Sequence, residues 1–139
     1  MNLYFEANAK HHSHVRLELN DQLVVASDGH GFCFDQQIST LRKNTVVVYW
    51  DCDTVIDTSL MIEKICVNDQ KLNINKSWYL PYDKPPGHIE YQTLHGGNLV
   101  WPGRLKLKFL VTNKREAYMA IRRETMSSHM MKLYSVIYD

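Results

Sequence analysis

Short segments in which apolar and polar residues alternate recur along the chain and constrain its fold more than any other feature. In residues 104–109, RLKLKF, the side chains of Leu105, Leu107 and Phe109 fall on one face and the cations fall on the other. Residues 15–19, VRLEL, show the same period of two. A strand that is buried on one face of a sheet has this period, whereas a helix has a period near 3.6. The pattern therefore predicts strands that each face a core on one side.

Turn signals separate these segments at intervals of about 8 to 12 residues. Tight turns are predicted at 20–21, inside a hairpin over 14–26, and at 68–69 and 27–31, whereas the Pro-rich segment 75–87 is predicted to be a loop without a central strand. Further strands are predicted over residues 2–8, 32–34, 71–74, 88–94, 116–123 and 132–138. We expect one all-β domain over residues 1–139, an antiparallel β-sandwich of the jelly-roll type.

Four carboxylates lie within a stretch of thirteen residues between two apolar runs: Asp51, Asp53, Asp57 and Glu63. Asp51 and Asp53 are two residues apart at the end of a predicted strand, so both side chains point to the same face. Carboxylates this close repel one another unless they are protonated, solvated or bound to a cation. Ca²⁺, which takes about six to eight oxygen ligands from flexible loops, suits such a set. Ordinary solvated turn carboxylates give the same pattern, so both interpretations stay open from the residues alone.

Residues 46–68, VVVYWDCDTVIDTSLMIEKICVN, resemble the calcium-dependent xylan-binding type of carbohydrate-binding module. In that family a strand ends in an Asn-Asp pair, an Asp-Arg-Asn-Leu segment follows, and the next strand carries an Asp before a Val-Asn-Gly turn. Asp53 matches the Asp of the pair, and Asp57 and Leu60 match the ends of the second segment. Glu63 matches the strand carboxylate and Asn68 the turn. With the upstream VRLELNDQLVV, the resemblance covers about 55 residues.

The resemblance implies a non-catalytic, extracellular module that holds Ca²⁺ in the acidic loop and binds a carbohydrate beside it. We therefore predict Ca²⁺ as the cofactor and a carbohydrate as the partner, with these metal ligands: Asp51, Asp53, Asp57 and Glu63. The family pattern is not intact, because other residues replace the Asn of the pair, the Arg-Asn of the second segment and the Gly of the turn: Cys52, Thr58, Ser59 and Asp69. A rival hypothesis is a metal-free protein-interaction module, of structural or viral origin, that forms a homo-oligomer or a larger assembly.

Aromatic residues in the loops supply candidates for sugar contacts. Trp78, Tyr79 and Tyr82 lie in the Pro-rich segment, and Trp101 lies beside Pro102. Aromatic faces stack against the apolar faces of sugars, so these four residues are the predicted ligand-binding set. The alternative is that such rings close the ends of a small core. For Trp50, on an apolar strand, we expect the core position.

A second candidate metal site is the histidine cluster at His11, His12 and His14. The spacing His12-x-His14-x-x-x-Glu18 resembles the first metal-binding motif of cupins, which predicts a metalloenzyme as a third, weaker hypothesis. The second cupin motif has only faint echoes at His88 and His95. A solvated cluster explains the same residues, so metal binding by these histidines is left open.

Composition argues against several other functions. The formal net charge is +1, which gives no reason to expect binding to nucleic acid or to an anionic membrane, although the last third of the chain is basic. Phosphate-binding loops, nucleophile elbows and HExxH helices are absent, so no enzyme is expected. The first residues lack a signal-peptide pattern and no apolar run reaches membrane-spanning length. We expect a soluble chain, with its compartment left open.

Overall fold

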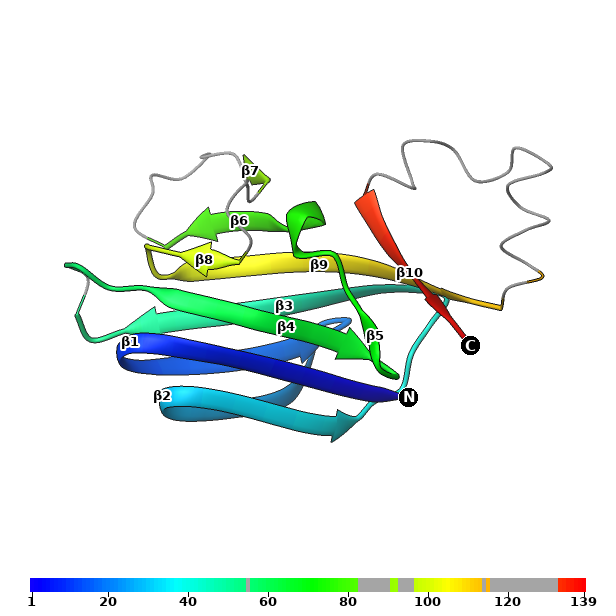
Figure 1. Ribbon diagram of the computed structural model, residues 1–139, viewed down its shortest axis with the longest axis horizontal. Helices are drawn as coiled ribbons and strands as arrows, with labels where there is room; N and C mark the ends of the chain where they lie inside the picture. Colours follow the sequence, from blue (N-terminus) through cyan, green and yellow to red (C-terminus); the bar gives the residue numbers. More distant parts are fainter. Residues whose placement is uncertain (55, 83–90, 93–96, 114, 116–132) are drawn as a thin grey trace.

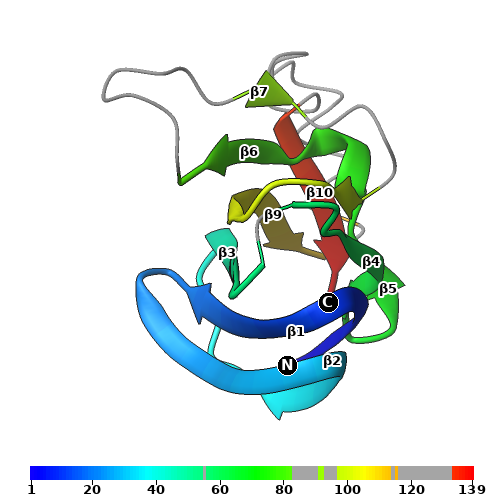
Figure 2. The same ribbon diagram turned by 90° about the vertical axis from the view of Figure 1, so that its left-hand side faces the viewer.

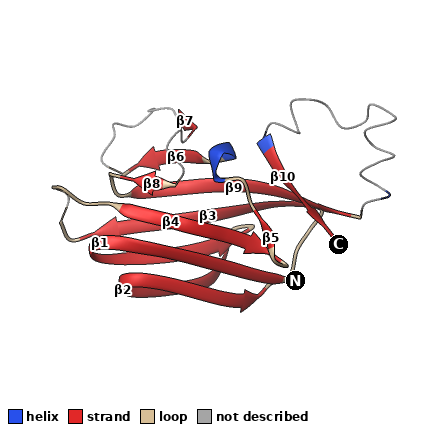
Figure 3. Cartoon of the chain, viewed as in Figure 1, coloured by secondary structure: helices blue, strands red, loops and turns tan. Residues whose placement is uncertain are grey.

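The computed structural model describes residues 1–54, 56–82, 91–92, 97–113, 115 and 133–139, and these form strands almost throughout (Figure 1) (Figure 3). The elements in chain order are β1 (Asn2–Leu19), β2 (Gln22–Gln37), β3 (Lys43–Cys52), β4 (Leu60–Val67), β5 (Gln70–Lys71), the 3-10 helix η1 (Ile74–Lys76), β6 (Trp78–Pro81), β7 (Tyr91–Gln92), β8 (Asn98–Leu99), β9 (Gly103–Thr112) and β10 (Tyr134–Tyr138). The prediction of an all-β fold is confirmed. No helix in the described ranges has the length and apolar character needed to cross a membrane.

The long hairpin of β1 and β2 belongs to both layers of a β-sandwich. It turns at Asn20 and Asp21, whose φ angles of 50° and 66° confirm the predicted tight turn. The first half of β1 pairs with β4, and the second half pairs with β3. Between these halves the β1–β2 register shifts, from Asn8 opposite Gly31 to Ser13 opposite Gly29. The hairpin curves at this bend and passes from one layer into the other (Figure 2).

The described strands join in the order β5-β4-β1-β3-β9-β6-β7, with β2 also on β1, β8 on β4 and β10 on β9. Every pairing is antiparallel except that of β10, which runs parallel to β9 from Tyr134 opposite Lys108 to Tyr138 opposite Thr112. This one parallel pairing departs from the predicted antiparallel sandwich. β10 pairs with the part of β9 that β6 leaves unpaired. Local alternation does not encode the direction of a partner strand, so the sequence could not predict this parallel pairing.

The core is filled by side chains at alternate positions of the strands. Leu105, Leu107 and Phe109 are fully buried, which confirms the alternation predicted for β9. Trp50 is also fully buried, as expected, and its indole N–H donates a hydrogen bond of 2.9 Å to the buried Ser13 Oγ. The outward face of the β2-β1-β3-β9-β6 layer carries the residues between these core positions, and the candidate site lies there.

Two local predictions fail because long-range pairing overrides local turn signals. The segment 27–31 is part of β2, where Gly29 adopts a φ of 143° that glycine tolerates and other residues rarely adopt. The polar residues 10–14, which show no clear strand pattern in the sequence, also lie inside β1. Residues 78–81 form β6, which lies between β9 and β7; Pro81 is tolerated because it is the last residue of the strand.

Other predictions are met in part or lie outside the described residues. The second Asn-Asp turn, at residues 68–69, is confirmed by φ angles of 47° and 63°. In the predicted strand 88–94 only Tyr91–Gln92 is described, as β7. The predicted strand 116–123 and the second cupin histidines, His88 and His95, lie outside the described part of the chain.

Candidate functional site

The bend of β1 lies against the acidic loop that follows β3. The Lys10 amide N–H donates to the Ser59 carbonyl at 3.0 Å, and the Lys10 ammonium pairs with Asp57 Oδ2 at 2.7 Å. His11 Nε2 lies 3.1 Å from the Asp57 carbonyl oxygen. The histidine cluster and the acidic loop, which the sequence presents as two unrelated candidates about 40 residues apart, therefore form one polar region.

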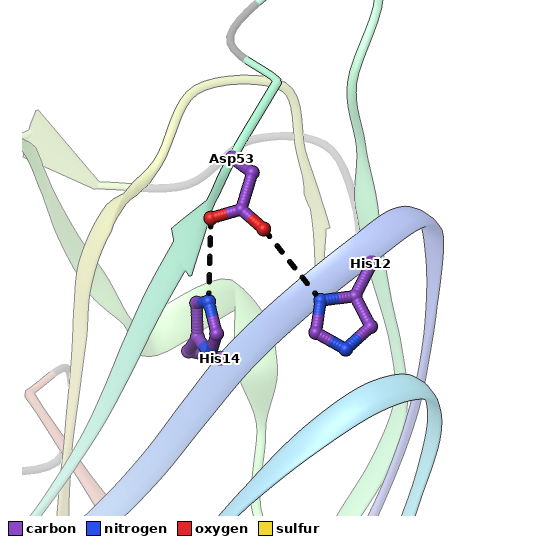
Figure 4. A group of neighbouring side chains, drawn as sticks. All are labelled: His12, His14 and Asp53. Carbon is purple, nitrogen blue, oxygen red and sulfur yellow. Dashed lines mark hydrogen bonds and ion pairs between the residues drawn. The ribbon is translucent and has the colours of Figure 1, made fainter.

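Within this region His12, His14 and Asp53 point toward one another (Figure 4). The two histidines lie at alternate positions of β1, so they share its outward face, and β3 pairs beside them with Asp51 opposite His14. Asp53 Oδ1 lies 3.4 Å from His14 Nε2, and its Oδ2 lies 3.7 Å from His12 Nδ1. In the described part of the chain, these are the three His, Cys, Asp or Glu residues whose ligand atoms gather within 4.8 Å of one another.

A second carboxylate holds His14 from the other side. Asp28, on β2 directly opposite His14, accepts a hydrogen bond of 2.6 Å from His14 Nδ1. The bond to Asp28, and after it the contact with Asp53, raises the pKa of His14 above its ordinary value, because both carboxylates favour the imidazolium. The bond to Asp28 therefore fixes the orientation of the His14 ring. Separately, the ring of His30 packs edge-on against that of His12, with 6.0 Å between the ring centroids.

The four predicted calcium ligands are not gathered at one point by this structure. Asp57 is paired with Lys10, which lowers the pKa of its carboxyl group, and Asp51 accepts the amide N–H of Cys52 at 2.8 Å. Glu63 lies on β4, where it lines a separate cavity of about 380 Å³. The described carboxylates thus do not fit a Ca²⁺ site that takes all its ligands from this set. Calcium binding stays a prediction from the sequence.

A groove of about 300 Å³ opens on the outward face of β1, β2 and β3, next to the His12, His14 and Asp53 cluster. The pairing of Asp28 with His14 and of His14 with Asp51 places three polar side chains in one row across its floor. The adjacent row carries Arg16 opposite Tyr49. The complete lining is His14, Val15, Arg16, Ala26, Ser27, Asp28, Tyr49, Asp51 and Tyr82. The groove therefore combines two phenol rings with charged groups.

The two tyrosines of the groove are held in different ways. The guanidinium of Arg16 lies 4.1 Å from the centre of the Tyr49 ring, and its Nε donates to Glu18 at 3.1 Å. Tyr82 is 49% exposed, and its amide N–H donates to the Pro102 carbonyl at 3.0 Å. Partial burial raises the pKa of Tyr82 to about 12. Tyr82 is the ring whose surface remains open for stacking, whereas Arg16 covers one face of Tyr49.

The other predicted aromatic contacts are distributed unevenly. Tyr79 is 3% exposed and belongs to the core, so its position is not the surface position that the sequence predicted. It alternates with Trp78 along β6, and Trp78 is half-buried on the outward side. Trp101 is about half exposed and immediately precedes Pro102, the residue that binds the Tyr82 backbone. Tyr82 lines the groove, and Trp101 is the sequence neighbour of Pro102, whose carbonyl accepts the Tyr82 amide N–H.

The cupin hypothesis does not match this arrangement. His12 and His14 lie on the outward face and are about half exposed, rather than inside a barrel. Glu18, the predicted third ligand, is bonded to Arg16, and Asp53 takes the carboxylate position instead. The spacing on β1 therefore finds two histidines that lie together, whereas Glu18 lies outside their group and Asp53 lies within it.

Sequence reasoning missed Arg16, Asp28 and Tyr49 as members of the site. Tyr49 lies between the buried Val48 and Trp50, so period-two alternation alone places it on the outward face. Asp28 had a local signal for a turn, and only the pairing of β1 with β2 reveals it as the partner of His14. The strand register was the missing information.

No protein-family model and no curated protein sequence matches the chain. A structural match is found to a carbohydrate-binding module solved as "vCBM60 in complex with galactobiose". The superposition has a TM-score of 0.55 at 14% sequence identity, and it covers 76% of this chain and 96% of that module. At this identity the match concerns the fold. The chain has a β-sandwich fold similar to that of this module.

Proposed function

We propose that this chain is a non-catalytic carbohydrate-binding module whose ligand lies in the groove formed by β1, β2, β3 and Tyr82. The observation that carries the proposal is the composition of that groove on a sandwich similar to a sugar-binding module. A half-exposed phenol ring adjoins the carboxylate of Asp51 and the guanidinium of Arg16 in a volume of about 300 Å³. That volume accommodates a small ligand.

Each part of the groove suits a different part of a sugar. The C–H face of a pyranose ring is apolar and stacks on an exposed aromatic ring, for which Tyr82 is available. Hydroxyl groups act as donors to carboxylates, and Asp51 and Asp28 supply these acceptors. Arg16 supplies charged donors, and its Nε bond to Glu18 restricts its motion, so less side-chain entropy is lost on binding. The proposed binding uses these contacts and involves no chemical step on the sugar.

Isothermal titration calorimetry with galactobiose and a panel of other oligosaccharides tests the proposal. We expect Tyr82→Ala to weaken binding about tenfold or more, because loss of a stacking contact at the centre of a site costs at least ~1.4 kcal/mol. Asp51→Asn is expected to weaken it as well. Tyr138→Ala is the matched control, since Tyr138 is a similarly exposed tyrosine on β10 that does not line the groove. Failure of every oligosaccharide to bind, or equal binding by Tyr82→Ala, would contradict the proposal.

Calcium dependence is a separate question within this proposal. The sequence resemblance predicts it, and the same titrations in excess Ca²⁺ and in chelator test it. An affinity that is lost in chelator and restored by Ca²⁺ but not by Mg²⁺ supports the prediction. Equal affinity under all three conditions leaves a sugar site that depends on the groove alone.

A further inference from the structure

We infer that His12, His14 and Asp53 form a binding site for one divalent transition-metal ion of the zinc type. The inference concerns these three side chains and does not rest on the proposed carbohydrate function. It unites two histidines of β1 with one carboxylate of the acidic loop, and it assigns them a ligand other than calcium.

The spacing of the ligand atoms fits a tetrahedral ion. Zn²⁺ lies about 2.0–2.2 Å from imidazole nitrogens and carboxylate oxygens, and at the tetrahedral angle two such ligands are about 3.4 Å apart. The His14 Nε2 to Asp53 Oδ1 distance is 3.4 Å, and the His12 Nδ1 to Asp53 Oδ2 distance is 3.7 Å. With one ligand atom taken from each residue, the three atoms lie within 4.8 Å of one another. Small rotations of exposed side chains are sufficient to close the site.

The strands hold the ligands in place before any ion binds. His12 and His14 come from alternate positions of β1, which directs both rings to one face, and Asp53 follows the last residue of β3. The Ser13–Cys52 and His14–Asp51 pairings join β1 to β3 beside the cluster. Sites built on paired strands lose little conformational entropy when they bind, which favours a specific site over a loose histidine surface.

A further contact resembles the outer shell of metal sites. A histidine that binds a metal through one ring nitrogen usually donates from the other nitrogen to a carboxylate or carbonyl, which fixes its tautomer and orientation. His14 donates from Nδ1 to Asp28 Oδ1 at 2.6 Å, which leaves Nε2 directed at Asp53. Asp28 is on a third strand, so the arrangement extends across β2, β1 and β3. Asp28 is assigned as a positioning residue.

The chemistry of the ligands selects the class of ion. Two of the three ligand atoms are imidazole nitrogens, which suit zinc, copper and nickel, whereas calcium and magnesium prefer sets made of oxygen alone. Three protein ligands leave at least one coordination position for water or for another ligand. Asp53 also belongs to the predicted calcium set, so occupancy by zinc removes it from that set.

Calorimetric titration of the full chain with ZnCl₂, after purification without a polyhistidine tag, tests the inference. We expect one Zn²⁺ per chain and a loss of affinity of about 100-fold or more in each of His12→Ala, His14→Ala and Asp53→Asn. Asp28→Asn is expected to keep the stoichiometry and to lose about 10- to 100-fold in affinity, with recovery in Asp28→Glu. Substitution of Co²⁺ for Zn²⁺ supplies a second readout, because the visible absorption of bound Co²⁺ reports its coordination geometry. We expect this spectrum to change in Asp28→Asn if Asp28 orients His14 as a metal ligand, and to stay the same if it does not.

The matched control is His11→Ala, because His11 is the neighbouring histidine of β1 and contacts the Asp57 carbonyl instead of the cluster. It is expected to bind Zn²⁺ with unchanged affinity. The side chains of His12, His14, Asp28 and Asp53 are 44–74% exposed, so their variants are expected to fold, and circular dichroism verifies this. Absence of one-to-one Zn²⁺ binding, or equal losses in His11→Ala and His14→Ala, would overturn the inference.

Discussion

The hydrogen bond between Trp50 and Ser13 joins the bend of β1 to β3 directly beneath the candidate site. Ser13 lies between His12 and His14, its side chain is fully buried, and its Oγ accepts from the Trp50 indole at 2.9 Å and donates to the His11 carbonyl at 2.9 Å. In Ser13→Ala the buried indole N–H loses this acceptor. An unsatisfied buried donor costs about 1–3 kcal/mol, so we expect the free energy of unfolding to fall by that amount.

The expected shift in melting temperature follows from the size of the chain. At about 2.1 cal/mol/K per residue, a chain of 139 residues has an unfolding entropy of about 290 cal/mol/K. A loss of 1–3 kcal/mol therefore lowers the melting temperature by roughly 3–10 °C. Urea unfolding followed by circular dichroism measures the free energy, and calorimetry measures the temperature.

The matched control is Ser39→Ala, which removes the hydroxyl of an exposed serine and is expected to change stability by no more than about 0.5 kcal/mol. A Ser13→Ala variant as stable as this control would contradict the expected cost of the unsatisfied indole N–H. It would mean that the indole N–H finds another partner and that the bend of β1 does not depend on this bond.

Two further predictions concern the backbone and the ion pairs around the site. Gly103→Ala is expected to lower the free energy of unfolding by about 1–3 kcal/mol in urea titrations, because a Cβ there collides with the Leu80 carbonyl oxygen and approaches Pro81 Cα to 2.8 Å; wild-type stability would contradict this. Lys10→Met is expected to raise the pKa of Asp57 toward its ordinary value in an NMR titration. The ion pair with Lys10 lowers the pKa of Asp57 in the folded state, so it stabilises the fold when Asp57 is ionised. This stabilisation is present above the pKa that Asp57 has in the unfolded chain, and it is lost as the pH falls through the folded-state pKa. An unchanged Asp57 pKa in Lys10→Met would show that Lys10 does not lower that pKa.

Much of the fold follows from features that are local in the sequence. The turns at Asn20 and Asn68 have the left-handed backbone that Asn and Asp tolerate, so residue type alone locates them. The alternation in β9 identifies its buried face because a strand has a period of two whatever its neighbours are. Both features depend on a few adjacent residues, which explains why they were predictable.

The remaining features depend on pairing between distant segments. Residues 10–14 have the composition of a loop, yet they continue β1 because β2, β3 and β4 supply partners on both sides of the bend. The parallel direction of β10 is also set by its partner rather than by its own sequence. No local pattern distinguishes these outcomes from the alternatives.

The candidate site shows the same division. His12, His14 and Asp53 were each singled out from the sequence, but in two separate hypotheses. Their approach depends on the register of β1 with β3, which no spacing in the chain reveals. Burial likewise separates Tyr82 from Tyr79, although both lie in the same aromatic segment.

The proposed carbohydrate site is the groove on the outward face of β1, β2 and β3. Amide chemical-shift mapping by NMR during titration with the tightest oligosaccharide of the panel tests it most directly. We expect shifts concentrated at residues 14–16, 26–28, 49–51 and 82, with little change along β10. Shifts confined to β4, β5 or β10, or none at saturating sugar, would contradict it.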